Sequence, residues 1–219
     1  MRLFALLICL LPSRVFACDL ALVLAVDVSG SVDRHEYRVQ MDGLAAALRD
    51  GIVTEALMSQ QARVTLVQWS GLSRQIQTVP WTAITSAQDV ADLSDAIAAD
   101  PRIWRNYSTA IGEALALSID LLNAVPCGRK VIDVSGDGLS NEGAEPQTQR
   151  AALSAQGIIV NALAIETDDT DLTGYFFENL IHGEGAFVVT ANGFEDYPDK
   201  IRRKLQRETT KQLSALTFR

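Results

Sequence analysis

The sequence predicts an α/β fold in which helices cover both faces of a doubly wound, mostly parallel β-sheet. Residues 20–26, 130–134 and 158–165 form apolar runs without alternation, which is typical of strands buried on both faces. Segments with helical periodicity lie between these runs. Strands that alternate with helices along the chain favour a parallel sheet joined by right-handed crossovers.

Three further strands complete the expected sheet. Residues 63–69 have a more alternating character, and a short turn at residues 70–73 separates them from an alternating segment at residues 75–79. This pair predicts a hairpin with an antiparallel strand at the edge of the sheet. Residues 186–190 are the last expected strand.

Helices are expected in the intervening segments. Apolar residues recur at helical spacing over residues 37–48 and 111–122, and residues 86–99 and 145–156 are also expected to be helical. Gly157 stands where the last of these should stop. A final helix is expected over residues 194–216, and we interpret its basic stretch, residues 200–211, as a solvated face beside the apolar Ile201, Leu205 and Leu213.

The first 17 residues resemble a secretory leader. Arg2 precedes a short apolar run, and Val15-Phe16-Ala17 fits a cleavage site. The run is far below the roughly 20 residues that span a bilayer, so we expect no transmembrane anchor. Phe16 is bulky for a lipobox ending at Cys18. We therefore predict a signal peptide over residues 1–17, one domain over residues 18–219, and export to the periplasm or beyond the cell.

The net charge limits the classes of partner, and the cysteines bear on a disulfide. The formal net charge of −8 disfavours nucleic acid and anionic lipid as partners. Cys9 would leave with the leader, so Cys18 and Cys127 remain as an even pair in an oxidising compartment, which favours a disulfide.

Hard oxygen donors gather where the predicted strands end. Asp27, Ser29 and Ser31 follow the first strand, Asp137 follows the strand at residues 130–134, and Thr109 begins the helix before that strand. In such sheets, ligands bind at the carboxyl ends of the central strands. Carboxylate and hydroxyl oxygens suit Mg²⁺, Mn²⁺ or Ca²⁺, with Mg²⁺ expected first. The alternatives are helix caps at Asp27, Ser29 or Thr109 and a simple turn at Asp137-Gly138.

These residues resemble a known site. Asp27-Val28-Ser29-Gly30-Ser31, Thr109 and Asp137 are similar to the metal-ion-dependent adhesion site (MIDAS) of von Willebrand factor type A domains. More narrowly, the segments from Cys18 and from Val131 resemble an uncharacterised family of secreted bacterial proteins with this domain. Tyr107 and Ser108 precede Thr109 where that pattern often has a small residue or glycine.

The resemblance implies a six-stranded sheet in the order 3-2-1-4-5-6 with one antiparallel edge strand. It also implies Ser29, Ser31 and Thr109 as direct metal ligands, with Asp27 and Asp137 acting largely through water. In this order the strands after Cys18 and Cys127 are neighbours, so a disulfide should join them. Candidate partner-binding positions at the rim are Asn106, Tyr107 and Asn141, together with Trp104, Arg105, Leu139 and Glu142.

We therefore expect a binding domain that holds a divalent cation and recruits an Asp or Glu of a partner protein. The alternatives are a Mg²⁺-dependent hydrolase and a structural exported domain with a non-functional metal site. Nucleotide-binding glycine motifs and a Gly-x-Ser-x-Gly frame around Ser135 are absent from the sequence. Neither His35 nor His182 has an evident serine or cysteine partner, so we predict that the chain is not an enzyme.

Overall fold

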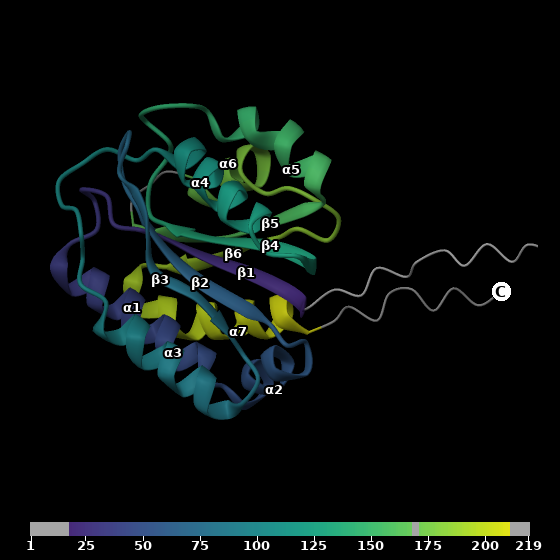
Figure 1. Ribbon diagram of the computed structural model, residues 1–219. Coiled ribbons are helices and arrows are strands. Elements are labelled where there is room, and N and C mark those ends of the chain that lie inside the picture. The colour runs from purple at the N-terminus through teal and green to yellow at the C-terminus, as the bar shows by residue number, and fades with distance from the viewer. Residues whose placement is uncertain (1–17, 168–170, 211–219) are drawn as a thin grey trace, which may run out of the picture.

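Six strands form one sheet in the order β3-β2-β1-β4-β5-β6 (Figure 1). The computed structural model describes residues 18–167 and 171–210. The strands are β1 (Cys18–Asp27), β2 (Arg63–Trp69), β3 (Gln75–Ala83), β4 (Cys127–Gly136), β5 (Ile158–Glu166) and β6 (Val188–Asn192). Neighbouring strands are parallel except for β2 and β3, which are antiparallel. The predicted fold class, strand order and antiparallel edge strand are confirmed.

Helices cover both faces of the sheet (Figure 1). One face carries α1 (Arg34–Leu48), α2 (Gly51–Ser59), α3 (Ala87–Ala99) and α7 (Tyr197–Thr209), and the other carries α4 (Ile111–Asn123), α5 (Arg150–Gln156) and α6 (Leu172–Asn179). Successive residues of β1 alternate between the two cores, with Leu22 in one and Val23 in the other. This double burial explains the unbroken apolar run of that strand. Within the described residues, no helix is long and apolar enough to cross a membrane.

The structure corrects several expected boundaries. The short helices α2 and α6 were not predicted, because nine and eight residues carry too few apolar repeats to establish a period. The helix expected over residues 145–156 divides into a 3₁₀ turn (Pro146–Gln149) and α5. The last strand starts at Val188, and α7 follows a second 3₁₀ turn (Phe194–Asp196). The leader and Leu213 lie outside the described residues.

A disulfide joins the starting residues of two neighbouring strands. Cys18 opens β1, Cys127 opens β4, and the two residues are direct partners in the parallel register. Their Cα atoms are 4.7 Å apart, and both side chains are buried. The bond therefore lies at the amino end of the sheet, opposite the edge where the strands deliver Asp27 and Asp137.

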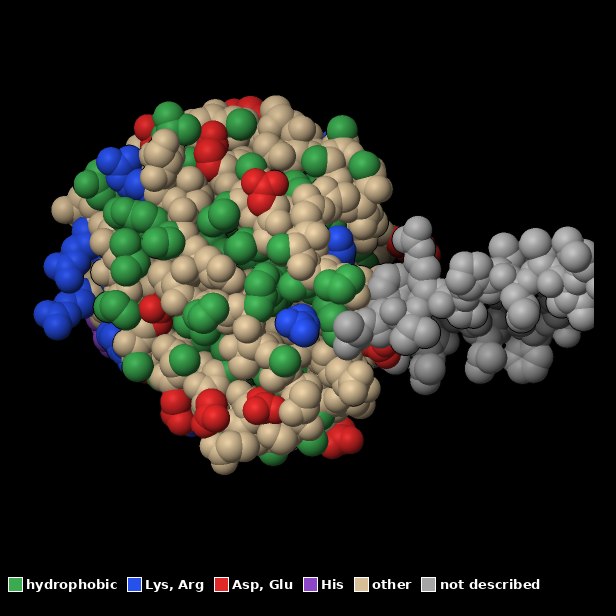
Figure 2. Space-filling model, viewed as in Figure 1, with side chains coloured by type: hydrophobic (Ala, Val, Ile, Leu, Met, Phe, Trp, Pro, Cys, Tyr) green, Lys and Arg blue, Asp and Glu red, His purple; other side chains and the backbone are tan. Residues whose placement is uncertain are grey.

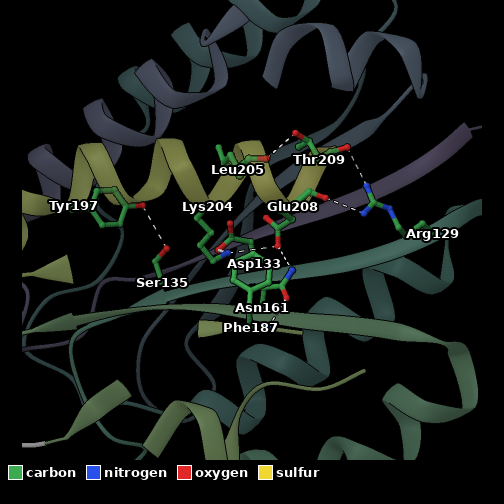
Figure 3. A network of polar contacts seen from close by, with 10 residues as sticks. All are labelled: Arg129, Asp133, Ser135, Asn161, Phe187, Tyr197, Lys204, Leu205, Glu208 and Thr209. Carbon is green, nitrogen blue, oxygen red and sulfur yellow. Dashed lines mark hydrogen bonds and ion pairs between the residues drawn. The ribbon is translucent and has the colours of Figure 1, made fainter. Parts of the chain in front are cut away.

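A buried ionic network fixes α7 to the sheet (Figure 3). Lys204 is fully buried, and its Nζ lies 2.5 Å from Asp133 Oδ1 and 3.6 Å from Glu208 Oε1. Asn161 donates a hydrogen bond of 2.6 Å to Glu208. Ile201 is buried on the same helix, as expected, but the expectation of a wholly solvated basic face is wrong at Lys204.

Burial sets the charge state of this network. It raises the pKa of Glu208 to about 8, with the negative charge of Asp133 acting in the same direction. Glu208 is therefore mainly protonated at neutral pH. A neutral Glu208 leaves less negative charge beside Lys204 and Asp133, which a low-dielectric interior favours.

Candidate metal centre

Four of the five candidate ligands lie together at the carboxyl edge of the sheet, where β1 and β4 end. The backbone N–H of Ser29 donates to Asp27 Oδ1 over 2.7 Å. The Ser29 and Ser31 hydroxyl oxygens lie 3.2 Å apart. Ser31 donates to Asp137 Oδ1 over 2.6 Å, which links the ends of β1 and β4. These contacts place both carboxylates and both serines around one point.

Thr109, the fifth candidate, lies beside this group at the start of α4. A methyl group placed on Gly138 would be 3.6 Å from Thr109 Oγ1, so the threonine side chain faces the residue that follows Asp137. Thr109 is buried, and its N–H donates to Asn141 Oδ1 over 2.9 Å. The N–H of Asn141 returns a 2.9 Å hydrogen bond to the Thr109 carbonyl. Asn141 thus holds Thr109 at both backbone groups.

The helix-cap interpretation of these residues is wrong. Asp33 caps α1 through a capping box with Glu36, so neither Asp27 nor Ser29 has that role. Ala110 is the N-cap residue of α4, and no side chain caps that helix. Asp137 does more than shape a turn, because it accepts a hydrogen bond from Ser31 on another loop. The local alternatives therefore do not account for the cluster.

The Asp27 carboxyl group is buried beside a second carboxyl group, that of Asp137. Its side chain is 0 % exposed, and Oδ2 has no hydrogen-bond partner among the residues described. Burial raises the pKa of Asp27 to about 8, and the charge of Asp137 adds to this rise, whereas Ser29 and Arg102 oppose it. Burial also raises the pKa of Asp137, against the effect of the Ser31 hydroxyl. A buried, unpartnered carboxylate oxygen is costly, and a cation beside it would relieve that cost.

Two side chains not singled out from the sequence hold the loop in place. Arg102 Nη2 donates to the carbonyls of Val28 (3.0 Å) and Ser29 (2.8 Å), and Gln40 Nε2 donates to the Asp27 carbonyl (3.1 Å). No local motif marks either residue, because each reaches the loop from another part of the chain. They position the loop without occupying the point where the oxygens meet.

Gly30 lets a second loop approach closely. Its N–H donates to the Tyr107 carbonyl over 2.8 Å. A Cβ at this position would lie 3.2 Å from that oxygen and 3.3 Å from the Asn106 Cα. Asn106 itself adopts a left-handed backbone with φ of 58°, which asparagine tolerates better than most residues.

The residues expected at the rim differ in their surroundings. Tyr107 is 42 % exposed and lies under the Arg74 guanidinium, 3.7 Å from the ring centroid, and Asn106 is exposed. Asn141 is exposed but also supports Thr109, as described above. Leu139 is exposed as well.

Two other rim candidates also make contacts within the chain. Glu142 accepts a hydrogen bond of 2.7 Å from the Leu72 N–H, so its carboxylate holds the loop after β2. Trp104 is half-buried and packs against the core. Both residues therefore have structural contacts of their own.

The donor set suits a hard divalent cation. Two carboxylates and three hydroxyls offer only oxygen, the ligand type that Mg²⁺, Mn²⁺ and Ca²⁺ prefer. Across residues 18–167 and 171–210, no three His, Cys, Asp or Glu side chains gather as they would in a site built from those ligands alone. With two carboxylates at most, the site would leave part of a bound cation's charge uncompensated. The orphaned oxygen of Asp27 and the chemistry of the donors both fit such an ion.

The expectation that neither histidine has a serine partner is wrong. His182 Nε2 lies 3.0 Å from the hydroxyl of Ser154 on α5. The described residues place no carboxylate within hydrogen-bonding or ion-pair distance of the His182 ring to orient it. Burial and the nearby Arg150 lower the pKa of His182. This pair lacks the third member that a Ser-His-acid triad needs.

Solved structures share this fold. Proximal thread matrix protein 1 from the mussel byssus, in a form with a zinc-occupied MIDAS motif, superposes with a TM-score of 0.68 at 21% identity, covering 87% of this chain and 48% of the other. The pilus adhesin SpaC of Lactobacillus rhamnosus GG gives 0.63 at 15% identity, over 88% and 31%. A von Willebrand factor type A protein of Catenulispora acidiphila gives 0.59 at 16% identity, over 88% and 42%.

This chain spans less than half the length of these three structures. No curated protein matches the sequence. Residues 17–213 match the family described as protein of unknown function DUF1194. The chain therefore belongs to the DUF1194 family and has the fold of von Willebrand factor type A domains.

Proposed function

We propose that this chain is an exported interaction domain that binds partners through a divalent cation. The cation is held by the cluster at the carboxyl edge of the sheet, with Mg²⁺ as the first expectation and Mn²⁺ or Ca²⁺ as alternatives. Its ligands are Asp27, Ser29, Ser31, Thr109 and Asp137. When bound, the cation supplies an electrophilic centre that accepts one carboxylate from outside the chain.

The observation that carries the proposal is the environment of Asp27. Its Oδ2 is buried without a partner among the described residues, and burial raises the pKa of the carboxyl to about 8. The hydroxyls of Ser29 and Ser31 and the carboxylate of Asp137 gather around the same point. Burying an unpartnered carboxylate oxygen costs free energy, and a cation at this point would offset that cost.

The structural neighbours favour binding over catalysis. They include a pilus adhesin and a byssus matrix protein, and the latter is described with zinc in its MIDAS motif. A partner Asp or Glu is the expected outside ligand, because two carboxylates leave the cation able to attract a third. Export follows from the leader expected over residues 1–17 and agrees with the disulfide between Cys18 and Cys127.

Calorimetric titration of Mg²⁺ and Mn²⁺ tests the metal site. Wild type should bind one ion, Asp27→Ala should not, and the exposed Asp92→Ala on α3 should bind as wild type does. Circular dichroism should show that both variants keep the fold. Equal heats from wild type and Asp27→Ala, or no binding by wild type, would contradict the proposal.

A further inference from the structure

A basic pocket opens beside the candidate metal centre. It encloses about 470 Å³ between the start of α1 and the loop before α4, and its walls include Gly30, Arg34, Arg38, Arg102 and Arg105. Gly30 lies between Ser29 and Ser31, so the pocket adjoins the proposed ligands directly. Figure 2 shows Lys and Arg side chains gathered at the left edge of the molecule, where Figure 1 places the start of α1.

The acidic residues of the pocket are already engaged by the fold. Asp33 accepts a hydrogen bond from the Glu36 N–H over 2.8 Å, and the Glu36 carboxylate accepts one from the Asp33 N–H over 2.6 Å. Asp100 accepts a hydrogen bond of 2.7 Å from the Gln68 side chain. These carboxylates hold the ends of helices and loops. Asp33 favours the charged form of Arg102, but among the described residues none of these carboxylates lies within ion-pair distance of a pocket arginine.

Two of the four arginine side chains of the pocket make no ion pair or hydrogen bond with the described residues. Arg38 pairs with Asp42, and Arg102 donates to backbone carbonyls of the metal loop. The side chains of Arg34 and Arg105 are exposed and have neither an ion pair nor a hydrogen bond with any residue that the structure describes. After burial, the charge of Arg105 is the next cause that lowers the pKa of Arg102, so these two guanidinium groups repel each other.

Arg34 and Arg105 thus place two guanidinium groups without ion pairs among the described residues at one pocket of a chain whose net charge is −8. Guanidinium binds carboxylate in a bidentate geometry, and this contact strengthens where water is partly excluded. The chain's overall negative charge would repel a long polyanion, whereas one short acidic segment can reach this positive region locally. The position of the pocket next to the metal loop allows one ligand to contact both.

We propose that the pocket receives a second carboxylate from the same partner segment whose first carboxylate binds the cation. The partner is then a protein segment with two Asp or Glu residues close in sequence, one for the metal and one for Arg34 and Arg105. This inference rests on the proposed function and adds a requirement for a pair of acidic residues.

Capped glycine-based peptides test the inference at saturating Mg²⁺ and low salt. One peptide carries a single Asp, and the others carry two Asp residues separated by one, two or three glycines. The best two-Asp peptide should bind about tenfold tighter than the single-Asp peptide, beyond the factor of about two that a second carboxylate gives by chance. In Arg34→Ala/Arg105→Ala, every two-Asp peptide should bind within about twofold of the single-Asp peptide measured on the same variant.

Arg49→Ala/Arg203→Ala is the matched control, because it removes the same charge from exposed positions outside the pocket. It should keep the two-Asp advantage. An advantage of twofold or less at every spacing, or equal losses in both double variants, would overturn the inference alone. Failure of the single-Asp peptide to bind in Mg²⁺ would overturn the proposed function as well. Tighter binding of a heparin hexasaccharide than of any peptide would assign the pocket to sulfated glycans and overturn the peptide assignment.

Discussion

Replacing Cys18 and Cys127 together by alanine should lower the free energy of unfolding by about 4.8 kcal/mol. The bond closes a loop with a sequence separation of 109 residues. In the chain-entropy model, a loop of this length removes about 16 cal/mol/K from the unfolded state, which gives that free energy at 25 °C. For a domain of this size, the expected fall in Tm is about 10–19 °C.

Guanidinium chloride unfolding of the double variant measures this difference. Wild type in a reducing buffer is the matched comparison, because reduction breaks the disulfide and leaves both sulfur atoms in the core. Both samples should lose a similar free energy relative to the oxidised protein. A loss below about 1.5 kcal/mol in both would refute the loop-entropy reasoning, since only a strongly structured unfolded state could then absorb the effect.

Three further changes have defined outcomes. Glu208 has a folded pKa of about 8 against an ordinary 4.5, so the folded state retains a proton that the unfolded state loses. The stabilisation from this proton is full below about pH 4.5 and is lost as the pH rises through about 8. Glu208→Gln should therefore reduce the difference between the free energies of unfolding measured in urea at pH 5 and at pH 8. Lys204→Met leaves Asp133 buried without its counter-ion and should lower the free energy of unfolding by about 3–5 kcal/mol. Adding Asp133→Asn should recover most of this loss. A small loss in the single variant would contradict the ion pair. Asn141→Ala should weaken Mg²⁺ binding by about 10–100-fold in calorimetry without a partner, because Thr109 loses the hydrogen bond that positions it. If Asn141 only contacted partners, its replacement would leave the metal affinity unchanged.

The sheet could be predicted from the sequence because its central strands are buried on both faces and therefore form unbroken apolar runs. The expected strand at residues 63–69 has the bounds of β2, since hydrophobic pattern and turn residues agree there. Short helices were harder to predict. The α6 helix has a cap signal, Asp171, which accepts from the Gly174 N–H, but its eight residues carry little periodicity.

Long-range pairing limits what sequence alone reveals about polar residues. Lys204 lies between the buried Ile201 and Leu205 on α7, a spacing that places it near the inner face of the helix. Its counter-ion, Asp133, stands in an apolar run on a strand far earlier in the chain. The sequence pattern singled out neither residue, and the pairing follows only from the fold. The same holds for Arg102 and Gln40, which reach the metal loop from distant segments.

The disulfide also has a geometric consequence for the proposed metal site. Cys18 is opposite Cys127, and eight residues further along both strands Val26 is opposite Ser135. Asp27 and Asp137 therefore follow in a fixed alignment. A slip of one residue between β1 and β4 would shift one carboxylate along the other by about 3.3 Å, too far for both to serve one ion. A covalent bond about 30 Å away at the opposite end of the strands forbids that slip, so oxidation of two cysteines outside the site sets the spacing of its acids.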